Sequence, residues 1–223
     1  MKKNYLIYFA IILLYMELVS CTTIVKDIDG NQYKTVLIGK QVWLKENLKT
    51  TKFNDGTEIK NVTNNDEWAN LTSPAYSWYY NDETANKKTY GAFYNWYAVN
   101  SKKLCPAGWH VPSDAEWIAL ATYIRIDSIS GGKLKEEGTS HWKIPNKYAT
   151  NETGFTALPG GYRSVLGVFN SLGINGYWWS TTPYNESTIL FWNLRYKYGF
   201  FYKYRSEKVC GFSVRCIQDS IHK

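Results

Sequence analysis

Few residues of this chain have the type and spacing that catalysis needs. Its three histidines, His110, His141 and His222, lie far apart, and no His-Glu-x-x-His, Cys-x-x-Cys, Gly-x-Ser-x-Gly or phosphate-loop motif occurs. Those motifs supply the metal ligands, nucleophiles and phosphate cradles of many hydrolases, zinc proteins and nucleotide-binding enzymes. The sequence therefore predicts a non-enzymatic protein without a cofactor, in which His110 makes a structural hydrogen bond.

One candidate cation site lies in the N-terminal region. Asp27, Asp29 and Asn31 alternate along the chain as calcium ligands do. A turn at Gly30 accounts for the same residues, because Asp, Asn and Gly are favoured in tight turns. We therefore predict no metal site there.

Aromatic and basic residues alternate from residue 195 to residue 205. Tyr196, Tyr198, Phe200, Tyr202 and Tyr204 fall on one parity, and mostly basic residues fall on the other. Such interleaving can stack nucleic-acid bases, but an amphipathic hairpin that turns near Gly199 explains it more simply. We expect this hairpin, with its aromatic side buried and its basic side in solvent.

The adjacent tryptophans Trp178 and Trp179 must point to opposite faces if they lie in a strand. Tyr177, Trp179 and Thr181 share the more apolar face, so Trp179 is predicted to be buried. Trp178 is then the candidate platform for a ligand. Further ligand-binding candidates, expected near Trp178, are Tyr162, Arg163 and Trp192.

The N-terminus has the pattern of an export signal. Lys2 and Lys3 precede an apolar stretch, residues 5–16, which is shorter than the roughly 18 to 20 residues of a spanning helix. Residues 18–21 (LVSC) resemble the lipobox of bacterial lipoproteins, whose cysteine, here Cys21, is acylated and becomes the first mature residue. An ordinary thiol near a plain secretory cleavage site is the alternative.

These patterns divide the chain. We expect a signal peptide over residues 1–20, a lipidated tether over 21–25, one domain over 26–219 and a tail over 220–223. The lipid would hold the protein at the inner or outer membrane of a bacterial cell envelope, with exposure at the cell surface left open.

Three further cysteines would then lie in a compartment where disulfides persist. If residues 211–217 form a straight strand, Cys210 and Cys216 are about 20 Å apart, whereas a disulfide needs Cα atoms within about 7 Å. We therefore predict a bond between Cys105 and Cys216. Cys210 is left as a buried thiol, unless Gly211 bends the chain sharply.

The composition predicts a folded, sheet-rich chain. Its 223 residues include 10 Trp and 19 Tyr, and only 20% are charged, which disfavours both disorder and a helical bundle. The net charge of +7 is scattered along the sequence. Because no basic tract is present, nucleic acid is not an expected partner.

Local patterns predict α+β architecture with a β-rich C-terminal half. The clearest helix begins after Ser113, which forms a capping box with Glu116, and runs to about residue 125. The other expected elements are a hairpin (33–38 and 41–44), a short helix or ordered loop (61–73), a helix (90–99), a long ordered loop (126–161) and strands (177–181, 188–198, 200–204 and 211–217).

Six ordered motifs resemble the Fibrobacter succinogenes major paralogous domain, which occurs in exported bacterial lipoproteins. They are residues 41–48 (QVWLKENL), 94–97 (YNWY), 105–117 (CPAGWHVPSDAEW), 154–163 (GFTALPGGYR), 178–181 (WWST) and 211–216 (GFSVRC). The resemblance implies a C-type-lectin-like fold with one or two helices and long ordered loops, related to the sulfatase-modifying enzymes. In such folds a disulfide commonly ties the first-helix region to the last strand. The family brings no established activity with it.

Two kinds of metal site known from related proteins lack their ligand residues in this chain. Calcium lectins of this fold use carboxylates where this chain has residues 144–146 (IPN) and 192–194 (WNL). The sulfatase-modifying enzymes bind copper through two cysteines, for which Cys210 and Cys216 are the candidates, but Cys216 is expected in the disulfide. We therefore predict no bound metal.

These observations favour a membrane-anchored, extracytoplasmic binding module. Its expected partner is a polysaccharide or a cell-envelope protein. The alternatives are a purely structural surface domain and, last, a copper-dependent oxidase.

Replacing the lipobox cysteine tests the anchor. In a Cys21→Ser variant no thiol is acylated, and each buried CH₂ of an acyl chain contributes about 0.8 kcal/mol of membrane affinity. We expect the protein to leave the membrane fraction, as a soluble or unprocessed form, when cell fractions are compared by immunoblot. Unchanged partitioning into detergent would contradict lipidation.

Overall fold

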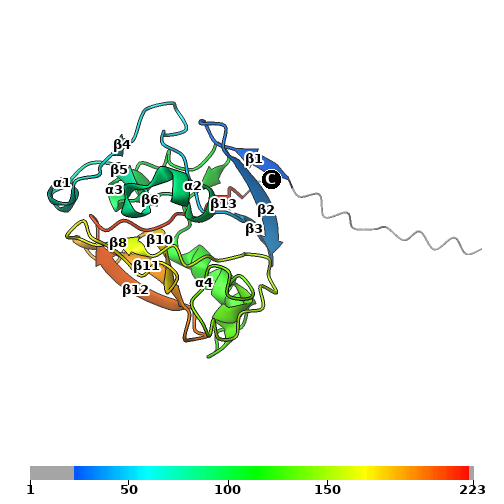
Figure 1. Cartoon of the computed structure of the whole chain (residues 1–223). Helices are drawn as coiled ribbons and strands as arrows, with labels where there is room; N and C mark the ends of the chain where they lie inside the picture. Colours follow the sequence, from blue (N-terminus) through cyan, green and yellow to red (C-terminus); the bar gives the residue numbers. More distant parts are fainter. Residues whose placement is uncertain (1–22, 221–223) are drawn as a thin grey trace, which may run out of the picture.

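The largest sheet joins the two ends of the chain. The computed structural model describes residues 23–220, and within them this antiparallel sheet has the strand order β1-β2-β3-β13-β7 (Figure 1). In its centre Ile217 pairs with Trp43 on one side and with His110 on the other. Its strands are β1 (Ile24–Lys26), β2 (Gln32–Ile38), β3 (Gln41–Leu44), β7 (Trp109–His110) and β13 (Ile217–Gln218).

A second antiparallel sheet lies on the other side of the molecule, at the lower left of Figure 1. It contains β10 (Asn175–Pro183), β11 (Thr188–Arg195) and β12 (Tyr202–Glu207), with β12 at one edge. The register places Trp178 opposite Trp192, and Phe191 between Trp179 and Tyr204.

Short strands and helices make up the rest of the described fold. The remaining strands are β4 (Lys60–Asn61), β5 (Ala75–Ser77), β6 (Phe93–Tyr94), β8 (Tyr162–Arg163) and β9 (Phe169–Asn170). The helices are α1 (Asn65–Ala69), α2 (Glu83–Tyr90), α3 (Trp96–Val99) and α4 (Asp114–Tyr123), with 3₁₀ turns η1 (Tyr79–Asn81) and η2 (Ser130–Lys133). The protein is therefore α+β, as predicted.

The elements with strong local signals form as expected. Strands β2 and β3 are the predicted N-terminal hairpin. The Ser113 side chain accepts a hydrogen bond from the Glu116 backbone, and the Glu116 carboxylate accepts one from Ser113, so α4 begins at the predicted capping box. Trp68 anchors α1 in the region where a short helix was expected.

Two predicted elements are wrong, and one helix was not predicted. Residues 90–99 form strand β6 and the single turn α3, because the Asn95 side chain caps a new helix at that point. Residues 211–216 make isolated bridges to Tyr94, Arg163 and Trp178, so only Ile217–Gln218 continue as strand β13. Helix α2, capped by Asp82, is too polar to show a helical hydrophobic pattern.

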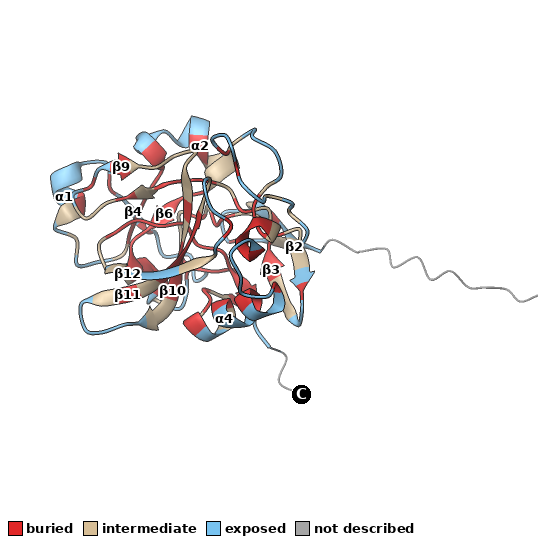
Figure 2. Cartoon of the chain, turned by 90° about the horizontal axis from the view of Figure 1, so that it is seen from below, coloured by how far each residue is buried: buried red, intermediate tan, exposed pale blue. Residues whose placement is uncertain are grey.

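The β10–β12 sheet separates two hydrophobic cores. Trp179 and Phe191 pack with Phe212 on one face, while Trp178 and Trp192 pack with the core around α4 on the other. Buried residues accordingly follow each other along β10 and β11, whereas β12 is mostly exposed or half-buried (Figure 2). Adjacent tryptophans can both be buried because both faces of the sheet are covered.

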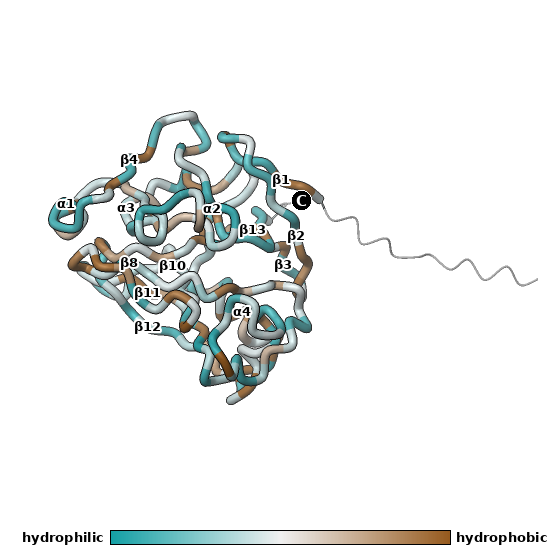
Figure 3. Tube along the Cα trace, viewed as in Figure 1, coloured by the Kyte–Doolittle hydropathy of each residue, from teal (hydrophilic) through white to brown (hydrophobic). Residues whose placement is uncertain are grey.

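Hydrophobic residues are spread over many short segments (Figure 3). Among residues 23–220, no helix has the length and apolarity required to cross a membrane.

A buried arginine connects the motifs of the fold. The guanidinium of Arg215, which is 1% exposed, donates to the carbonyls of Leu44, Lys45 and Phe155 and to the side-chain oxygen of Asn47. The same Asn47 oxygen accepts from the Trp178 indole at 2.9 Å. Hairpin, loop, sheet and closing segment therefore meet at one polar network.

Arg215→Met should strongly destabilise the protein. The substitution leaves buried carbonyls without donors, each at a cost of about 1 to 3 kcal/mol, so we expect the free energy of unfolding to fall by at least about 3 kcal/mol. The exposed Arg205→Met is the matched control, expected to change it by less than about 0.5 kcal/mol. Urea denaturation measures both, and equal effects would show that the Arg215 network does not stabilise the fold.

Candidate functional site

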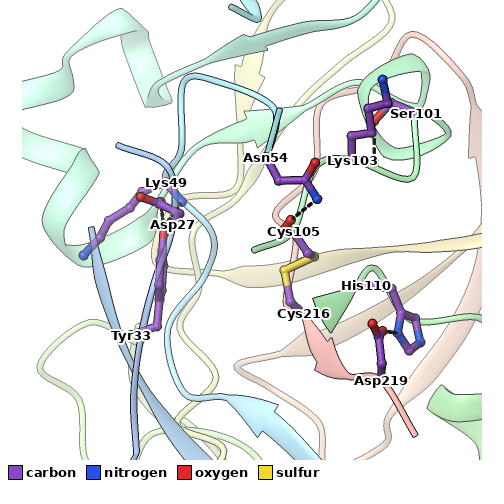
Figure 4. The surroundings of a disulfide bond; sticks show 10 residues. All are labelled: Asp27, Tyr33, Lys49, Asn54, Ser101, Lys103, Cys105, His110, Cys216 and Asp219. Carbon is purple, nitrogen blue, oxygen red and sulfur yellow. Dashed lines mark hydrogen bonds and ion pairs between the residues drawn. A yellow bond between two sulfur atoms is a disulfide. The ribbon is translucent and has the colours of Figure 1, made fainter. Parts of the chain in front are cut away.

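The predicted disulfide is present. Cys105 and Cys216 are bonded with a Cα–Cα distance of 6.1 Å, and the bond ties the loop before α4 to the last strand (Figure 4). The loop it closes spans 111 residues, which corresponds to about 4 to 5 kcal/mol in the chain-entropy description. Cys210 is a buried free thiol, and burial raises its pKa to about 11. A thiol with this pKa is protonated at neutral pH and is a poor nucleophile.

His110 is held between two carboxylates. Its Nδ1 lies 2.6 Å from a carboxylate oxygen of Asp219, and its Nε2 lies 2.8 Å from one of Glu116. Figure 4 shows the imidazole ring facing Asp219. The hydrogen bond to Glu116 is the main reason that the pKa of His110 rises to about 9, with Asp219 adding to it. Because both ring nitrogens donate, neither can accept a proton from a substrate, and the predicted structural role fits this geometry.

The aspartates near Gly30 form a turn, as expected. The Asp27 carboxylate accepts from the backbone and side chain of Asn31 and from the hydroxyl of Tyr33. Asp29 accepts from Thr50 and Thr51. These oxygens are engaged within the protein, so the pattern that resembles calcium ligands has a structural explanation.

Three of the four predicted ligand-binding residues are buried. Trp178 is 0% exposed, Trp192 is 4% exposed and Arg163 is 0% exposed. The prediction of Trp178 as an exposed platform is therefore wrong, because α4 and its core cover the face of the sheet that strand parity left open. Trp192 is enclosed with it and donates to Asp114 at 3.0 Å.

Arg163 and Tyr162 follow each other in β8 and point to different surroundings. Arg163 binds backbone carbonyls of the segment before α1. Tyr162 remains half-buried, and its ring packs 4.8 Å from that of Tyr177 in the neighbouring sheet. Tyr162 is therefore the one predicted ligand-binding residue at an accessible surface.

A row of exposed and half-buried aromatic side chains lies across the β10–β12 sheet. Tyr202 and Tyr204 are nearly parallel, with ring centroids 5.8 Å apart and an interplanar angle of 24°. The guanidinium of Arg195 lies over both rings, at 4.9 and 5.3 Å from their centroids. Tyr177 extends the row, since both it and Tyr202 pair with Asn193 of β11. We call this set, Tyr177, Arg195, Tyr202 and Tyr204, the aromatic face.

The turn between β11 and β12 adds two further rings. Tyr198 and Phe200 are 48% and 43% exposed, and each contacts Tyr202. The expectation that this aromatic side is buried is therefore wrong, although the hairpin itself forms. The reason is that Phe212 covers Tyr177, Trp179 and Phe191 but does not extend over β12.

Buried polar groups fix the aromatic face. The side-chain oxygen of Asn193, which is 0% exposed, accepts from Arg195 Nε at 2.8 Å and sets the direction of that side chain. Lys135, also 0% exposed, donates to the carbonyls of Lys147, Arg195 and Tyr198. Burial lowers the pKa of Lys135 to about 8. The carbonyls of Arg195 and Tyr198 flank the turn between β11 and β12, so these hydrogen bonds from Lys135 fix the backbone of the turn.

The aromatic face combines two kinds of contact. Tyrosine rings can stack on a flat apolar surface, such as one side of a sugar ring. Arg195 forms no salt bridge with any carboxylate of the described residues, so its terminal nitrogens can bind a carboxylate of a ligand. Sequence reasoning weighed the aromatic residues of this face but placed their rings inside, because parity alone does not show which side of an edge strand is covered.

Comparison with protein-family models identifies a family for most of the chain. The model described as Fibrobacter succinogenes major domain matches residues 36–218, a range that contains β3, α4, the β10–β12 sheet and the disulfide. Searches of curated proteins and of solved structures gave no match.

The ion pairs of His110 predict a pH-dependent contribution to stability. The pKa of His110 is raised in the folded state to about 9 from 6.5, so its contribution is full below pH about 6.5 and is lost as the pH rises through about 9. We expect the difference in unfolding free energy between the wild type and His110→Asn to shrink over this interval. Urea denaturation from pH 6 to pH 10 measures it, and a constant difference would contradict the paired imidazolium.

Proposed function

The chain belongs to the Fibrobacter succinogenes major domain family, and from this premise we propose that it is a lipid-anchored binding module of the bacterial cell envelope. Its ligand is a glycan that carries carboxylate groups, and the aromatic face binds it. The observation that carries the proposal is the juxtaposition of two nearly parallel tyrosines, the half-buried Tyr202 and the exposed Tyr204, with the guanidinium of Arg195, which forms no salt bridge with a carboxylate of residues 23–220.

The charge around the aromatic face favours an acidic ligand. Arg195, Lys197 and Arg205 lie on or beside the hairpin, and the whole chain carries a net charge of +7. Long-range attraction of this sign raises the rate at which an anionic polymer is captured. The tyrosine rings can then stack on the sugar rings of a uronic acid chain. This contact would distinguish such a chain from polyanions that bind through charge alone.

The position of the proposed anchor supports the same function. Strand β1 begins at Ile24, three residues after Cys21, and lies on the opposite side of the ribbon from β12 (Figure 1). A lipid on Cys21 would therefore hold the β1 side toward the membrane and leave the aromatic face directed away from it. This is the orientation that a receptor for an extended polysaccharide needs.

The relation to C-type lectins is part of the proposal. A disulfide from the residues before α4 to the last strand, long ordered loops and a β-rich second half all agree with it. No catalytic role is assigned. An oxidase that binds copper through Cys210 and Cys216 would need both thiols, and the sulfur of Cys216 is bonded to Cys105.

Titration with polygalacturonate tests the aromatic face, with fully methyl-esterified galacturonan as the neutral counterpart. We expect saturable binding of the acidic polymer in calorimetry, and affinity lowered about tenfold or more by Arg195→Gln, since a hydrogen bond to a charged group contributes about 1.5 to 3 kcal/mol. Tyr204→Ala should weaken binding about five- to tenfold through lost stacking.

Tyr123→Ala is the control, because Tyr123 is also an exposed tyrosine, at the end of α4. Its affinity for polygalacturonate should equal that of the wild type. Equal loss in all three variants, or no binding of either polymer, would contradict the proposal and favour a purely structural surface domain.

A further inference from the structure

A second aromatic ring is presented to solvent far along the chain from the aromatic face. Tyr80 is 69% exposed, whereas its neighbour Tyr79 is 5% exposed. Tyr80 packs edge-on against Tyr79 and against Phe169 of β9, with centroid distances of 4.6 and 5.7 Å. The ring is thereby supported by two aromatic side chains while most of its surface remains exposed.

The backbone at this point has a conformation that few residues adopt. Tyr80 and Asn81 have φ angles of 49° and 59°, both in the left-handed region that non-glycine residues rarely occupy. Two consecutive strained residues persist only where the surroundings determine them, and such sites are often functional.

The ring forms one wall of an open cleft. The cleft has a volume of about 570 Å³, which lies within the range of small-molecule sites. The residues that line it and matter for recognition are Asn64, Asn65, Asp66, Tyr80, Asn81 and Phe169. Amides and one carboxylate thus stand beside an aromatic wall, without a basic side chain among them.

Arg163 holds the walls of this cleft together. Its guanidinium donates to the carbonyls of Val62, Thr63 and Asn64 on one side and of Gly167 on the other. It also lies over the rings of Trp68 and Phe169, at 4.3 and 4.7 Å from their centroids. A buried cation therefore joins the segment before α1 to the β8–β9 turn.

The contact between these two walls requires a glycine. Gly167 has a φ of +74°, and a Cβ atom there would lie 2.6 Å from the Cα and carbonyl oxygen of Asn65. The cleft is thus a rigid feature, fixed by a buried arginine and a close backbone approach, rather than a gap between loose loops.

Several polar groups of the cleft are free to bind a ligand. Asn81 uses its amide nitrogen to bind the Thr63 carbonyl, and Asn65 uses its side-chain oxygen to accept from Arg163. The amide oxygen of Asn81 and the amide nitrogens of Asn64 and Asn65 make no hydrogen bond within residues 23–220, and the Asp66 carboxylate forms no salt bridge there. The cleft thus offers both donors and acceptors, which suits the hydroxyl groups of a sugar.

We propose that the Tyr80 cleft is a second binding site, for an uncharged pyranose ring that stacks on Tyr80 and hydrogen-bonds through its hydroxyl groups to Asn64, Asn65, Asp66 and Asn81. A neutral sugar fits better than an acidic one because Asp66 is the charged group that lines the cleft. The proposal does not depend on the aromatic face, whose ligand is anionic.

The test uses the full chain, ¹⁵N-labelled, with the neutral disaccharides cellobiose and maltose as probes. We expect saturable amide shifts at Asn65, Asn81 and Phe169 for at least one of them, with a Kd of about 1 mM, which corresponds to a weak single-ring contact. Tyr80→Phe should keep this Kd within about twofold, and Tyr80→Ala should raise it about tenfold or more.

Tyr80→Gly separates binding from structure. Glycine adopts a positive φ without strain, so this variant should have an unchanged or higher melting temperature while the disaccharide shifts disappear. The proposal is overturned if no cleft amide shifts with either probe, or if Tyr80→Gly melts at a lower temperature and binds as the wild type does. Neither result would affect the aromatic face, because that site is read out by polygalacturonate and Arg195.

Discussion

The structure depends on three buried cations that bind backbone carbonyls. Lys135, Arg163 and Arg215 are each 0% or 1% exposed, and within residues 23–220 none of them pairs with a carboxylate. Burying a charge is costly unless hydrogen bonds replace its hydration. A chain with many short strands also has long loops, and the buried carbonyls of these loops lack the hydrogen-bond donors that a neighbouring strand would supply. Each cation solves both problems at once, because it binds three or four backbone carbonyls and ties together segments that are distant in the sequence.

Each cation serves a different part of the molecule. Arg215 connects the N-terminal hairpin with the loop that contains Phe155 and, through Asn47, with Trp178 of β10. Lys135 holds the β11–β12 turn and therefore the rings of Tyr198 and Phe200 that extend the aromatic face. Arg163 fixes both walls of the Tyr80 cleft. In this account, binding surfaces are built on loops, and the loops are rigid because a buried cation fixes their backbone.

The sequence predicted what depends on neighbours along the chain. The α4 helix follows from its capping box. The bond between Cys105 and Cys216 is also present, although the straight strand over residues 211–217 from which it was inferred does not form. The sequence could not predict which faces are covered. Trp178 and Tyr204 were assigned opposite to what is found, because exposure depends on α4 lying over one face of the sheet and on Phe212 ending short of the other edge. Nor does any local pattern distinguish Arg163 and Arg215, which are buried, from Arg195, which is not. Their environment is created by carbonyls from segments about 100 to 170 residues away.

Hydrogen–deuterium exchange of a Lys135→Met variant tests the central role of these cations most directly. Removal of the ammonium group leaves the carbonyls that flank the β11–β12 turn without their donor. If the account is correct, amides of residues 196–201 exchange about tenfold faster or more, while those of β10 and β11 keep their protection, because local opening does not require global unfolding. Unchanged exchange at residues 196–201, or an equal increase throughout the domain, would contradict the claim that Lys135 fixes this turn.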